Sequence, residues 1–230
     1  MTATVIPVPA PTTLPVRGSD AVFPVRRIYC VGRNFADHAK EMGATVDRGN
    51  PVFFMKPGDA IVAGGGRVPY PPGTRDLHHE VELVVALGRD ADGPVTVADA
   101  PALVFGYGVG LDLTRRDLQA NAKAKGLPWD TAKGFDHSAP ASELVPVAAA
   151  GEIFTRTLSL EVNGELRQQA RLDTMVFTVA EVLHELSKLY ALKAGDLVFM
   201  GTPAGVAALV PGDHFRASVD GLLALEGDIA

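Results

Sequence analysis

The chain is dominated by short runs in which apolar and polar residues alternate, or in which apolar residues follow one another directly. Both patterns are typical of β-strands, half-buried in the first case and buried on both faces in the second. They predict strands over residues 27–32, 51–56, 78–87, 104–112 and 197–200. A hairpin is expected over residues 158–167, because Asn163-Gly164 is typical of a two-residue turn.

Helical patterns are fewer and shorter. An amphipathic helix is expected over residues 178–192, and shorter helices over 34–43 and 114–125. Asn34 is placed to cap the helix at 34–43 and Gly43 to end it. The 24 glycines and 17 prolines show no repeat, so many turns between short strands are expected. Together these patterns predict a β-rich α+β fold with a few short helices.

Length and composition favour one main domain. A chain of 230 residues that is 47% hydrophobic can form one substantial core. Residues 1–24 are rich in proline and are expected to form an extended arm or a short edge hairpin, which leaves residues 25–230 as the main domain.

Charge and hydropathy exclude several kinds of partner. The net charge of -6, without a basic tract, argues against nucleic acid, and no apolar run is long enough to predict a membrane span. The N-terminus lacks the basic and apolar regions of a signal peptide, and Cys30 is the only cysteine. We therefore expect a cytoplasmic protein without an intrachain disulfide.

Two glutamates occupy the polar start of the strand expected over residues 78–87. Side chains two residues apart in a strand share a face, so Glu80 and Glu82 should project side by side next to a buried segment. Two carboxylates cannot both stay ionised in a dry site without a cation, and paired oxygens suit Mg²⁺ or Mn²⁺. The alternative is a solvent-facing strand edge with two exposed glutamates, and this stretch alone does not decide between the two.

Three further acidic and basic residues are candidates for the same site. Asp112 follows a strand with alternating glycines; it either caps the next helix or becomes a third metal ligand if the two strands are neighbours. His38 and Glu41 are three residues apart on a short helix and share a face. A histidine oriented by a carboxylate can transfer protons near neutral pH, but an exposed pair on a helix has the same spacing.

Polar and cationic side chains follow on the helix at 114–125 and in the loop after it. Arg116 and Gln119 lie on the first turns of that helix and could bind an anionic substrate or form ordinary surface. Lys133 lies between alanine and glycine in an otherwise apolar stretch. If buried, it would stabilise negative charge; otherwise it is a solvated loop lysine.

Five stretches of the sequence together resemble the fumarylacetoacetate hydrolase family. They are YCVGRNFADH at 29–38, HEVEL at 79–83, GLDLTRRD at 110–117, AKGFD at 132–136 and GTPAGV at 201–206. They occur in the family's order. The resemblance implies that residues 25–230 form a catalytic domain, a mixed β-sandwich roll that is usually a homodimer. It also implies a Mg²⁺ or Mn²⁺ site on Glu80, Glu82 and Asp112.

The resemblance also assigns roles to the other candidates. His38 and Glu41 correspond to the water-activating pair, on a segment that orders over bound substrate, and Lys133 and Gln119 to stabilisers of developing negative charge. Arg33, Arg116 and Thr202 correspond to substrate contacts. One position departs from the pattern: Val31 stands where the branch that cleaves fumarylacetoacetate has a further aspartate ligand. This favours the smaller, acylpyruvate-cleaving branch.

The implied activity is metal-dependent hydrolysis of a carbon–carbon bond in a 2,4-diketo acid. The overall similarity favours cleavage of fumarylpyruvate to fumarate and pyruvate, in aromatic catabolism of the gentisate type. Arg33, Arg48 and Arg116 are candidates for contacting the fumaryl carboxylate. The alternatives on the same metal site are an oxaloacetate decarboxylase, a general acylpyruvase, or an isomerase or hydratase of related keto acids. A binding module without activity is disfavoured, because every catalytic position carries a competent residue type.

Overall fold

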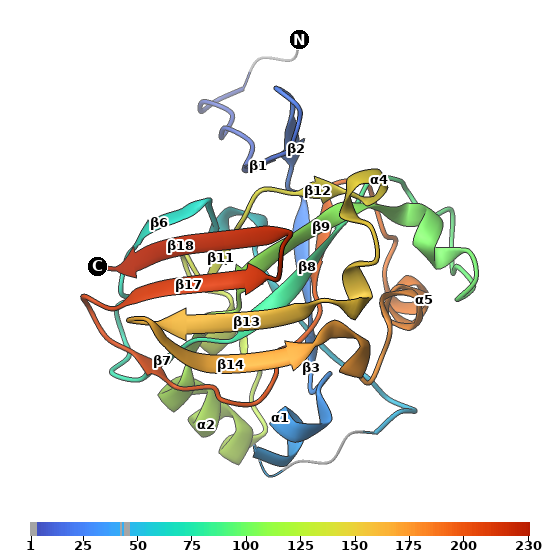
Figure 1. Cartoon of the computed structure of the whole chain (residues 1–230). Coiled ribbons are helices and arrows are strands. Elements are labelled where there is room, and N and C mark those ends of the chain that lie inside the picture. Colours follow the sequence, from blue (N-terminus) through green and yellow to red (C-terminus); the bar gives the residue numbers. More distant parts are fainter. Residues whose placement is uncertain (1–3, 42, 44–46) are drawn as a thin grey trace.

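Two β-sheets packed face to face form the body of the molecule (Figure 1). The computed structural model describes residues 4–41, 43 and 47–230, so residues 1–3 of the expected arm and residues 42 and 44–46 lie outside the described residues. The larger sheet has the order β4 (Val52–Lys56), β3 (Arg27–Gly32), β15 (Asp196–Phe199), β8 (Val81–Leu87), β9 (Val104–Leu111), β11 (Ala139–Ala141) and β5 (Ile61–Ala63), with β12 (Val145–Pro146) also on β9. The smaller sheet has the order β14 (Glu165–Arg171), β13 (Thr157–Val162), β17 (His214–Val219), β18 (Leu223–Ile229) and β6 (Gly65–Val68).

Short elements surround the two sheets. A three-stranded sheet joins β10 (Thr114–Arg115), β7 (Leu77–His78) and β16 (Ala208–Leu209), and a hairpin joins β1 (Thr13–Pro15) to β2 (Val22–Pro24). The helices are α1 (Ala36–Glu41), α2 (Arg116–Lys125), α3 (Asp130–Lys133), α4 (Val147–Ala150) and α5 (Val179–Leu189). The described residues also form the 3₁₀ turns η1 (Gly58–Ala60), η2 (Ala100–Leu103), η3 (Ile153–Thr155) and η4 (Leu172–Thr174). The predicted β-rich fold with a few short helices is confirmed.

Strand β8 lies in the middle of the larger sheet and is buried on both faces. Leu83 and Val85 face the main core, which the smaller sheet and α5 complete. Val84 and Ala86 face the opposite side, where a second apolar cluster includes residues of the N-terminal hairpin. By the alternation of a strand, Glu82 belongs to this second face. The Glu82 side chain therefore lies next to the apolar side chains of Val84 and Ala86, at the end of that face.

The alternating glycines of β9 are needed for close packing. A Cβ on Gly106 would lie 2.4 Å from the carbonyl oxygen of Val145, and a Cβ on Gly110 would lie 2.8 Å from the ring of Phe199 and 2.9 Å from the carbonyl oxygen of Pro140. The close approach of another chain segment, predicted from the alternation, is present.

Local signals explain the two best-predicted elements. Asn163 and Gly164 both have positive φ (53° and 77°) and form the turn between β13 and β14. At the start of α5 the Thr178 hydroxyl accepts from the Glu181 amide, and the Glu181 carboxylate accepts from the Thr178 amide, which is a capping box. The helix expected over 178–192 is α5, and it ends earlier than predicted, at Leu189.

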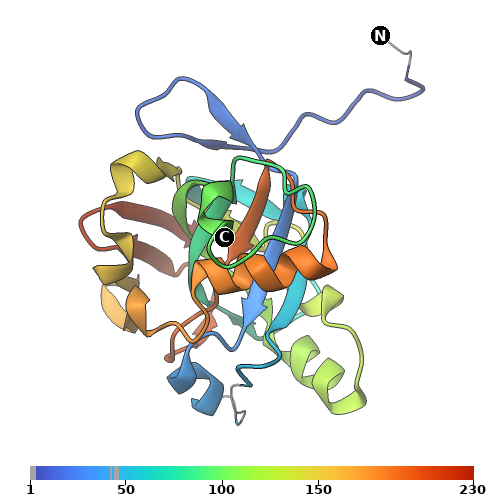
Figure 2. The same cartoon turned by 90° about the vertical axis from the view of Figure 1, so that its right-hand side faces the viewer.

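The N-terminal segment forms the β1–β2 hairpin, which projects from one end of the molecule (Figure 2). Leu14 and Phe23 of the hairpin are buried against the larger sheet. The Arg17 guanidinium pairs with Glu143 at 2.6 Å, and the Leu144 amide donates to the carbonyl of Pro15. Among the helices that the structure describes, none has the length and apolar character needed to cross a membrane.

Candidate metal centre and active site

Three acidic side chains meet at one end of the larger sheet. Glu80 immediately precedes β8, Glu82 lies on it, and Asp112 immediately follows β9. Each offers a carboxylate oxygen, and these oxygens lie within 4.8 Å of one another. All three side chains are buried. In this structure they form a buried acidic cluster, and the alternative of an exposed strand edge is wrong.

The antiparallel pairing of β8 with β9 produces this convergence. The register places Glu82 opposite Gly110, and the Asp112 amide donates to the carbonyl oxygen of Glu80 at 2.8 Å. The strand that ends at Asp112 is therefore the neighbour of the glutamate strand. This was the condition under which Asp112 could join the two glutamates as a ligand.

Two basic residues neutralise Glu80. The Arg116 guanidinium lies 2.5 Å from Glu80 Oε1, and the Lys133 ammonium lies 2.8 Å from Glu80 Oε2 and 2.6 Å from Asp112 Oδ2. Burial by itself would raise the pKa of Glu80, but Lys133 and Arg116 outweigh it and hold the pKa well below its ordinary range. Burial would lower the pKa of Lys133, but the carboxylates of Asp112 and Glu80 raise it. Lys133 is therefore buried and not a solvated loop lysine.

Glu82 lacks such a partner among the described residues. Its Oε2 accepts one hydrogen bond, from the Gly201 amide at 2.7 Å. Burial, and then the charges of Asp112 and Glu80, raise the pKa of Glu82 well above its ordinary range. A dication among the three carboxylates would remove this penalty, and their oxygen atoms are ligands that Mg²⁺ and Mn²⁺ prefer. The residues present therefore fit such an ion.

Lys56 is a charged residue of this centre that sequence reasoning missed. It ends β4, is 1% exposed, and its ammonium lies 2.8 Å from Asp112 Oδ1. It also donates to the backbone carbonyls of Leu113 and Lys133. The sequence pattern of a lysine at the end of an apolar strand predicts an exposed side chain, where the strand reaches solvent. Only the tertiary contact with Asp112 shows otherwise.

His38 and Glu41 lie on α1, beside the acidic cluster. His38 is buried, and its Nδ1 lies 3.2 Å from Glu41 Oε2. The Glu41 carboxylate also accepts from the Gly205 amide at 3.0 Å, which joins α1 to the loop after β15. His38 is buried and lines the pocket over the acidic cluster, whereas Glu41 is exposed and contacts His38 from the rim.

Most of the predicted site residues line one pocket, whereas Glu41, Asp112 and Thr202 lie beside it. The predicted residues that line it are Arg33, His38, Glu80, Glu82, Arg116, Gln119 and Lys133. The rest of the lining consists of Val31, Gly32, Phe54, Lys123 and Trp129. The carboxylates, His38, Gln119 and Lys133 are buried, whereas Arg33 and Lys123 are exposed. The pocket therefore has an acidic floor and a basic mouth.

Thr202 lies next to the site and is held by a buried glutamine that the sequence did not indicate. Gln168 Oε1 accepts from the Val81 amide, and its Nε2 donates to the carbonyl of Pro203, so these contacts fix the orientation of the amide. The same Nε2 donates to Thr202 Oγ1 at 2.8 Å. The hydroxyl hydrogen of Thr202 is therefore available to donate to another group.

The role expected of Asn34 as a helix cap is wrong. Its side chain is buried, donates to the carbonyls of Phe177 and Met200, and accepts from the Phe177 amide. Helix α1 begins two residues later, at Ala36. Asn34 instead fastens the junction between β3 and α1 to two distant segments of the chain.

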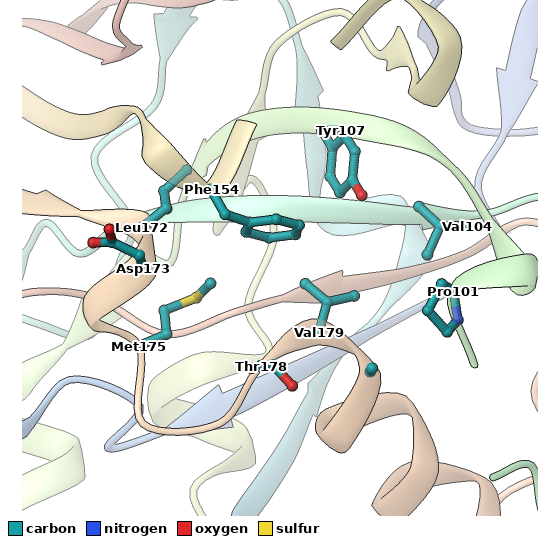
Figure 3. A pocket seen from close by; sticks show the side chains of 10 residues that line it. Pro101, Val104, Tyr107, Phe154, Leu172, Asp173, Met175, Thr178 and Val179 are labelled. Atoms are coloured by element: carbon teal, nitrogen blue, oxygen red, sulfur yellow. The ribbon is translucent and has the colours of Figure 1, made fainter. Parts of the chain in front are cut away.

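A larger cavity lies elsewhere and is unsuited to this chemistry. It has a volume of about 470 Å³. Figure 3 shows its largely apolar lining, with Tyr107 and Phe154 on one side and Met175 and Val179 on the other. Asp173 is the only carboxylate that lines it, and this side chain is paired with Arg171. The smaller pocket over the three carboxylates is therefore the candidate active site.

Comparison with known proteins agrees with these observations. The sequence model of the family described as "Fumarylacetoacetate (FAA) hydrolase C-terminal" matches residues 27–230. Oxaloacetate tautomerase FAHD1, mitochondrial, of Rattus norvegicus is 44% identical over 200 residues, which cover 87% of this chain and 90% of that protein. Fumarylpyruvate hydrolase of Ralstonia sp is 40% identical over 183 residues, 79% of this chain and 94% of that protein.

A solved structure is similar over almost the whole chain. It is the crystal structure of fumarylpyruvate hydrolase from Pseudomonas aeruginosa in complex with Mn²⁺ and pyruvate. Its TM-score is 0.95 at 43% sequence identity, and the match covers 99% of each chain.

Proposed function

Because this chain belongs to the fumarylacetoacetate hydrolase family, we propose that it hydrolyses a carbon–carbon bond of a 2,4-diketo acid, with fumarylpyruvate as its substrate. The similarity to two fumarylpyruvate hydrolases supports this choice. The observation that carries the proposal is the position of His38, held by Glu41, in the pocket above three buried carboxylates.

We propose that Glu80, Glu82 and Asp112 hold a Mg²⁺ or Mn²⁺ ion. Their buried oxygens converge, and Glu82, unlike Glu80 and Asp112, forms no ion pair with a described side chain. The similar structure that contains Mn²⁺ and pyruvate supports this assignment. Such an ion, when bound, acts as a Lewis acid toward the α-keto acid end of the substrate.

His38 is the proposed general base. Its Nδ1 faces the Glu41 carboxylate, so in the neutral ring Nδ1 carries the hydrogen and Nε2 keeps the lone pair. Nε2 takes a proton from water as the water oxygen attacks the carbonyl carbon of the fumaryl group. The hydrogen bond from the Gly205 amide to Glu41 keeps the pair in place.

Gln119 and Lys133 are the proposed stabilisers of the oxyanion that this attack forms. Gln119 Oε1 accepts from Arg116 at 2.6 Å, so the amide nitrogen of Gln119 is the group left to donate. Lys133 supplies a buried positive charge at the floor of the same pocket. Preorganised donors of this kind are effective in a water-excluded site.

Collapse of the tetrahedral intermediate breaks the bond between the former carbonyl carbon and the methylene carbon. The bonding electrons pass to the pyruvate enolate, and protonated His38 returns the proton to the methylene carbon. The new carboxyl group releases the second water proton to solvent, so one fumarylpyruvate and one water give fumarate, pyruvate and one proton, and His38 regains its starting state.

The test is an absorbance assay of the purified protein with Mn²⁺, with fumarylpyruvate, acetylpyruvate and oxaloacetate offered in parallel. We expect metal-dependent loss of fumarylpyruvate with release of pyruvate. The His38→Ala variant should lower kcat by about 10²- to 10⁴-fold, the usual contribution of a general base. Turnover of fumarylpyruvate that survives this substitution would contradict the proposed mechanism.

A second candidate is the interconversion of the keto and enol forms of oxaloacetate. The similarity to oxaloacetate tautomerases favours it, because their identity to this chain is as high as that of the fumarylpyruvate hydrolase. This reaction moves one proton between carbon and oxygen and consumes no water. His38 could therefore perform it on the same site. Fast decay of enol-oxaloacetate without release of pyruvate, together with inert fumarylpyruvate, would identify the tautomerase.

A further inference from the structure

The mouth of the active-site pocket carries two cations that have no ion pair with any described residue. Arg116 pairs with Glu80, and Lys133 pairs with Glu80 and Asp112, so the cations at the floor are neutralised. Arg33 and Lys123 line the same pocket, and neither forms a salt bridge or side-chain hydrogen bond within the described part of the chain. The pocket thus has unused positive charge at its entrance.

Lys123 is held over an aromatic ring. It lies on α2, four residues after Gln119, which places both side chains on the same face of the helix. Its ammonium lies 5.3 Å from the centroid of the Trp129 ring, and Trp129 in turn packs against Phe54 with ring centroids 5.8 Å apart. Phe54 and Trp129 both line the pocket. A cation–π contact thus orients this ammonium at the mouth.

The charges around Lys123 repel it. Burial, and then Arg116, lower the pKa of Lys123; Glu80 opposes this effect, while Arg33 and Lys133 add to it. Arg33 lines the same pocket as Lys123. Its backbone has φ of 61°, a conformation that residues other than glycine rarely adopt, directly after β3 ends. An anion bound between Arg33 and Lys123 would relieve the repulsion.

The other arginines expected to contact the distal end of the substrate are already engaged. Arg116 contacts Glu80 and Gln119, and Arg48 donates to the carbonyl oxygen of Val176. Of the three arginines considered from the sequence, Arg33 is the one that lines the pocket without such a contact.

We propose that Lys123 and Arg33 form a second anion subsite at the pocket mouth, which binds the distal carboxylate of a dianionic keto acid. The inference rests on the proposed function, in which the α-keto acid end occupies the pocket floor. The subsite would select substrates whose acyl group ends in a carboxylate over those whose acyl group ends in a methyl group. Lys123 and Trp129 thereby become determinants of specificity.

The kinetic test compares fumarylpyruvate with acetylpyruvate, which lacks the distal carboxylate. For Lys123→Gln we expect KM for fumarylpyruvate to rise roughly 10- to 100-fold, the effect of losing a charge-assisted hydrogen bond. KM for acetylpyruvate should change less than about twofold on the same reasoning. Lys123→Arg should keep most of the preference, because it retains the charge and the contact with Trp129.

Lys125→Gln is the matched control. Lys125 is exposed on the same helix two residues later and does not line the pocket, so its substitution should leave both substrates unaffected. An equal effect of Lys123→Gln on both substrates, or no effect on either, would overturn the subsite. Arg33→Gln provides an independent second variant with the same expectation.

A binding measurement separates this inference from the proposed reaction. Trp129 is the only tryptophan of the chain, so intrinsic fluorescence reports directly on the pocket mouth. The probes are fumarate and crotonate, which share a carbon skeleton and differ by one carboxylate. Fumarate should bind the Mn²⁺-loaded protein more tightly than crotonate, and Lys123→Gln should abolish the difference. If fumarylpyruvate is not hydrolysed but this difference is found, the proposed function fails and the subsite stands. Equal binding of fumarate and crotonate by the unmodified protein would refute the subsite.

Discussion

At the scale of single residues, the three carboxylates of the site differ in whether a cationic side chain pairs with them. Lys133 touches both Glu80 and Asp112, Lys56 pairs with Asp112, and Arg116 pairs with Glu80. Glu82 receives only a backbone amide. The resulting difference in pKa makes Glu82 the carboxylate whose ionisation costs the metal-free fold the most, and the one that gains most from a dication.

Glu82→Gln should therefore stabilise the metal-free protein and weaken its response to Mn²⁺. The glutamine oxygen can still accept from the Gly201 amide, while the unfavourable charge is gone. Because folding raises the pKa of Glu82, the unmodified metal-free protein loses stability as pH rises above the ordinary pKa of a glutamate. The variant should lose less stability over the same range.

Thermal unfolding with EDTA and with Mn²⁺, at several pH values, checks both expectations. The unmodified protein should gain stability with Mn²⁺ according to mass action, and the variant should gain less at the same concentration. A variant that is less stable than the unmodified protein in EDTA at neutral pH would show that the charge of Glu82 is not a burden on the fold.

At the scale of elements, the position of α1 depends on the segment around η4. Asn34 bonds to Phe177, and the Val176 amide donates to the carbonyl of Asn34. The same segment, through Met175 and Thr178, forms one wall of the apolar cavity in Figure 3. Helix α1, which carries the proposed general base, is thus anchored from outside the pocket.

Asn34→Ala should loosen this anchor. It leaves the Phe177 amide and two buried carbonyls without their partner, at a cost of about 1–3 kcal/mol in unfolding free energy for a buried unsatisfied group. It should also lower kcat, because His38 follows Asn34 by four residues on the segment that loses its attachment.

Urea unfolding and steady-state kinetics measure the two effects. Asp37→Asn, on the exposed side of the same short helix, is the control and should change neither quantity. An Asn34→Ala protein with normal kcat and reduced stability would show that α1 keeps its position without this anchor.

The elements also show what sequence patterns could and could not predict. Strand alternation in 78–87 correctly placed Glu80 and Glu82 together, and Asn163-Gly164 correctly located a hairpin turn. The roles of Lys56 and Gln168 could not be predicted, because each depends on a partner brought close by tertiary structure. The prediction that Asn34 caps a helix was wrong for the same reason, because its local pattern fits a cap while its hydrogen bonds reach distant segments.

At the scale of the whole molecule, the charge of the pocket changes from negative at its buried floor to positive at its exposed mouth. The acidic cluster is buried at one end of the larger sheet, whereas Arg33 and Lys123, which have no ion pair among the described residues, are exposed at the pocket mouth. Under the proposed function, the surface charge attracts a dianionic keto acid and the pocket holds it at both ends. The family resemblance that implies this chemistry also predicts a homodimer.

We accordingly expect light scattering to give a mass about twice the 24.2 kDa of one chain.

A protein that lacks residues 1–11 should have the same association state and the same melting temperature. Of the residues that the structure describes in this arm, 4–11 are all exposed and Leu14 is the first that is buried, so no described core contact is lost. By contrast, Leu14→Ala should destabilise the fold by about 2–5 kcal/mol, because Leu14 packs in the apolar cluster behind the larger sheet. A truncated protein that becomes monomeric, while its unfolding stays cooperative, would contradict this expectation and place the start of the chain in the contact between subunits.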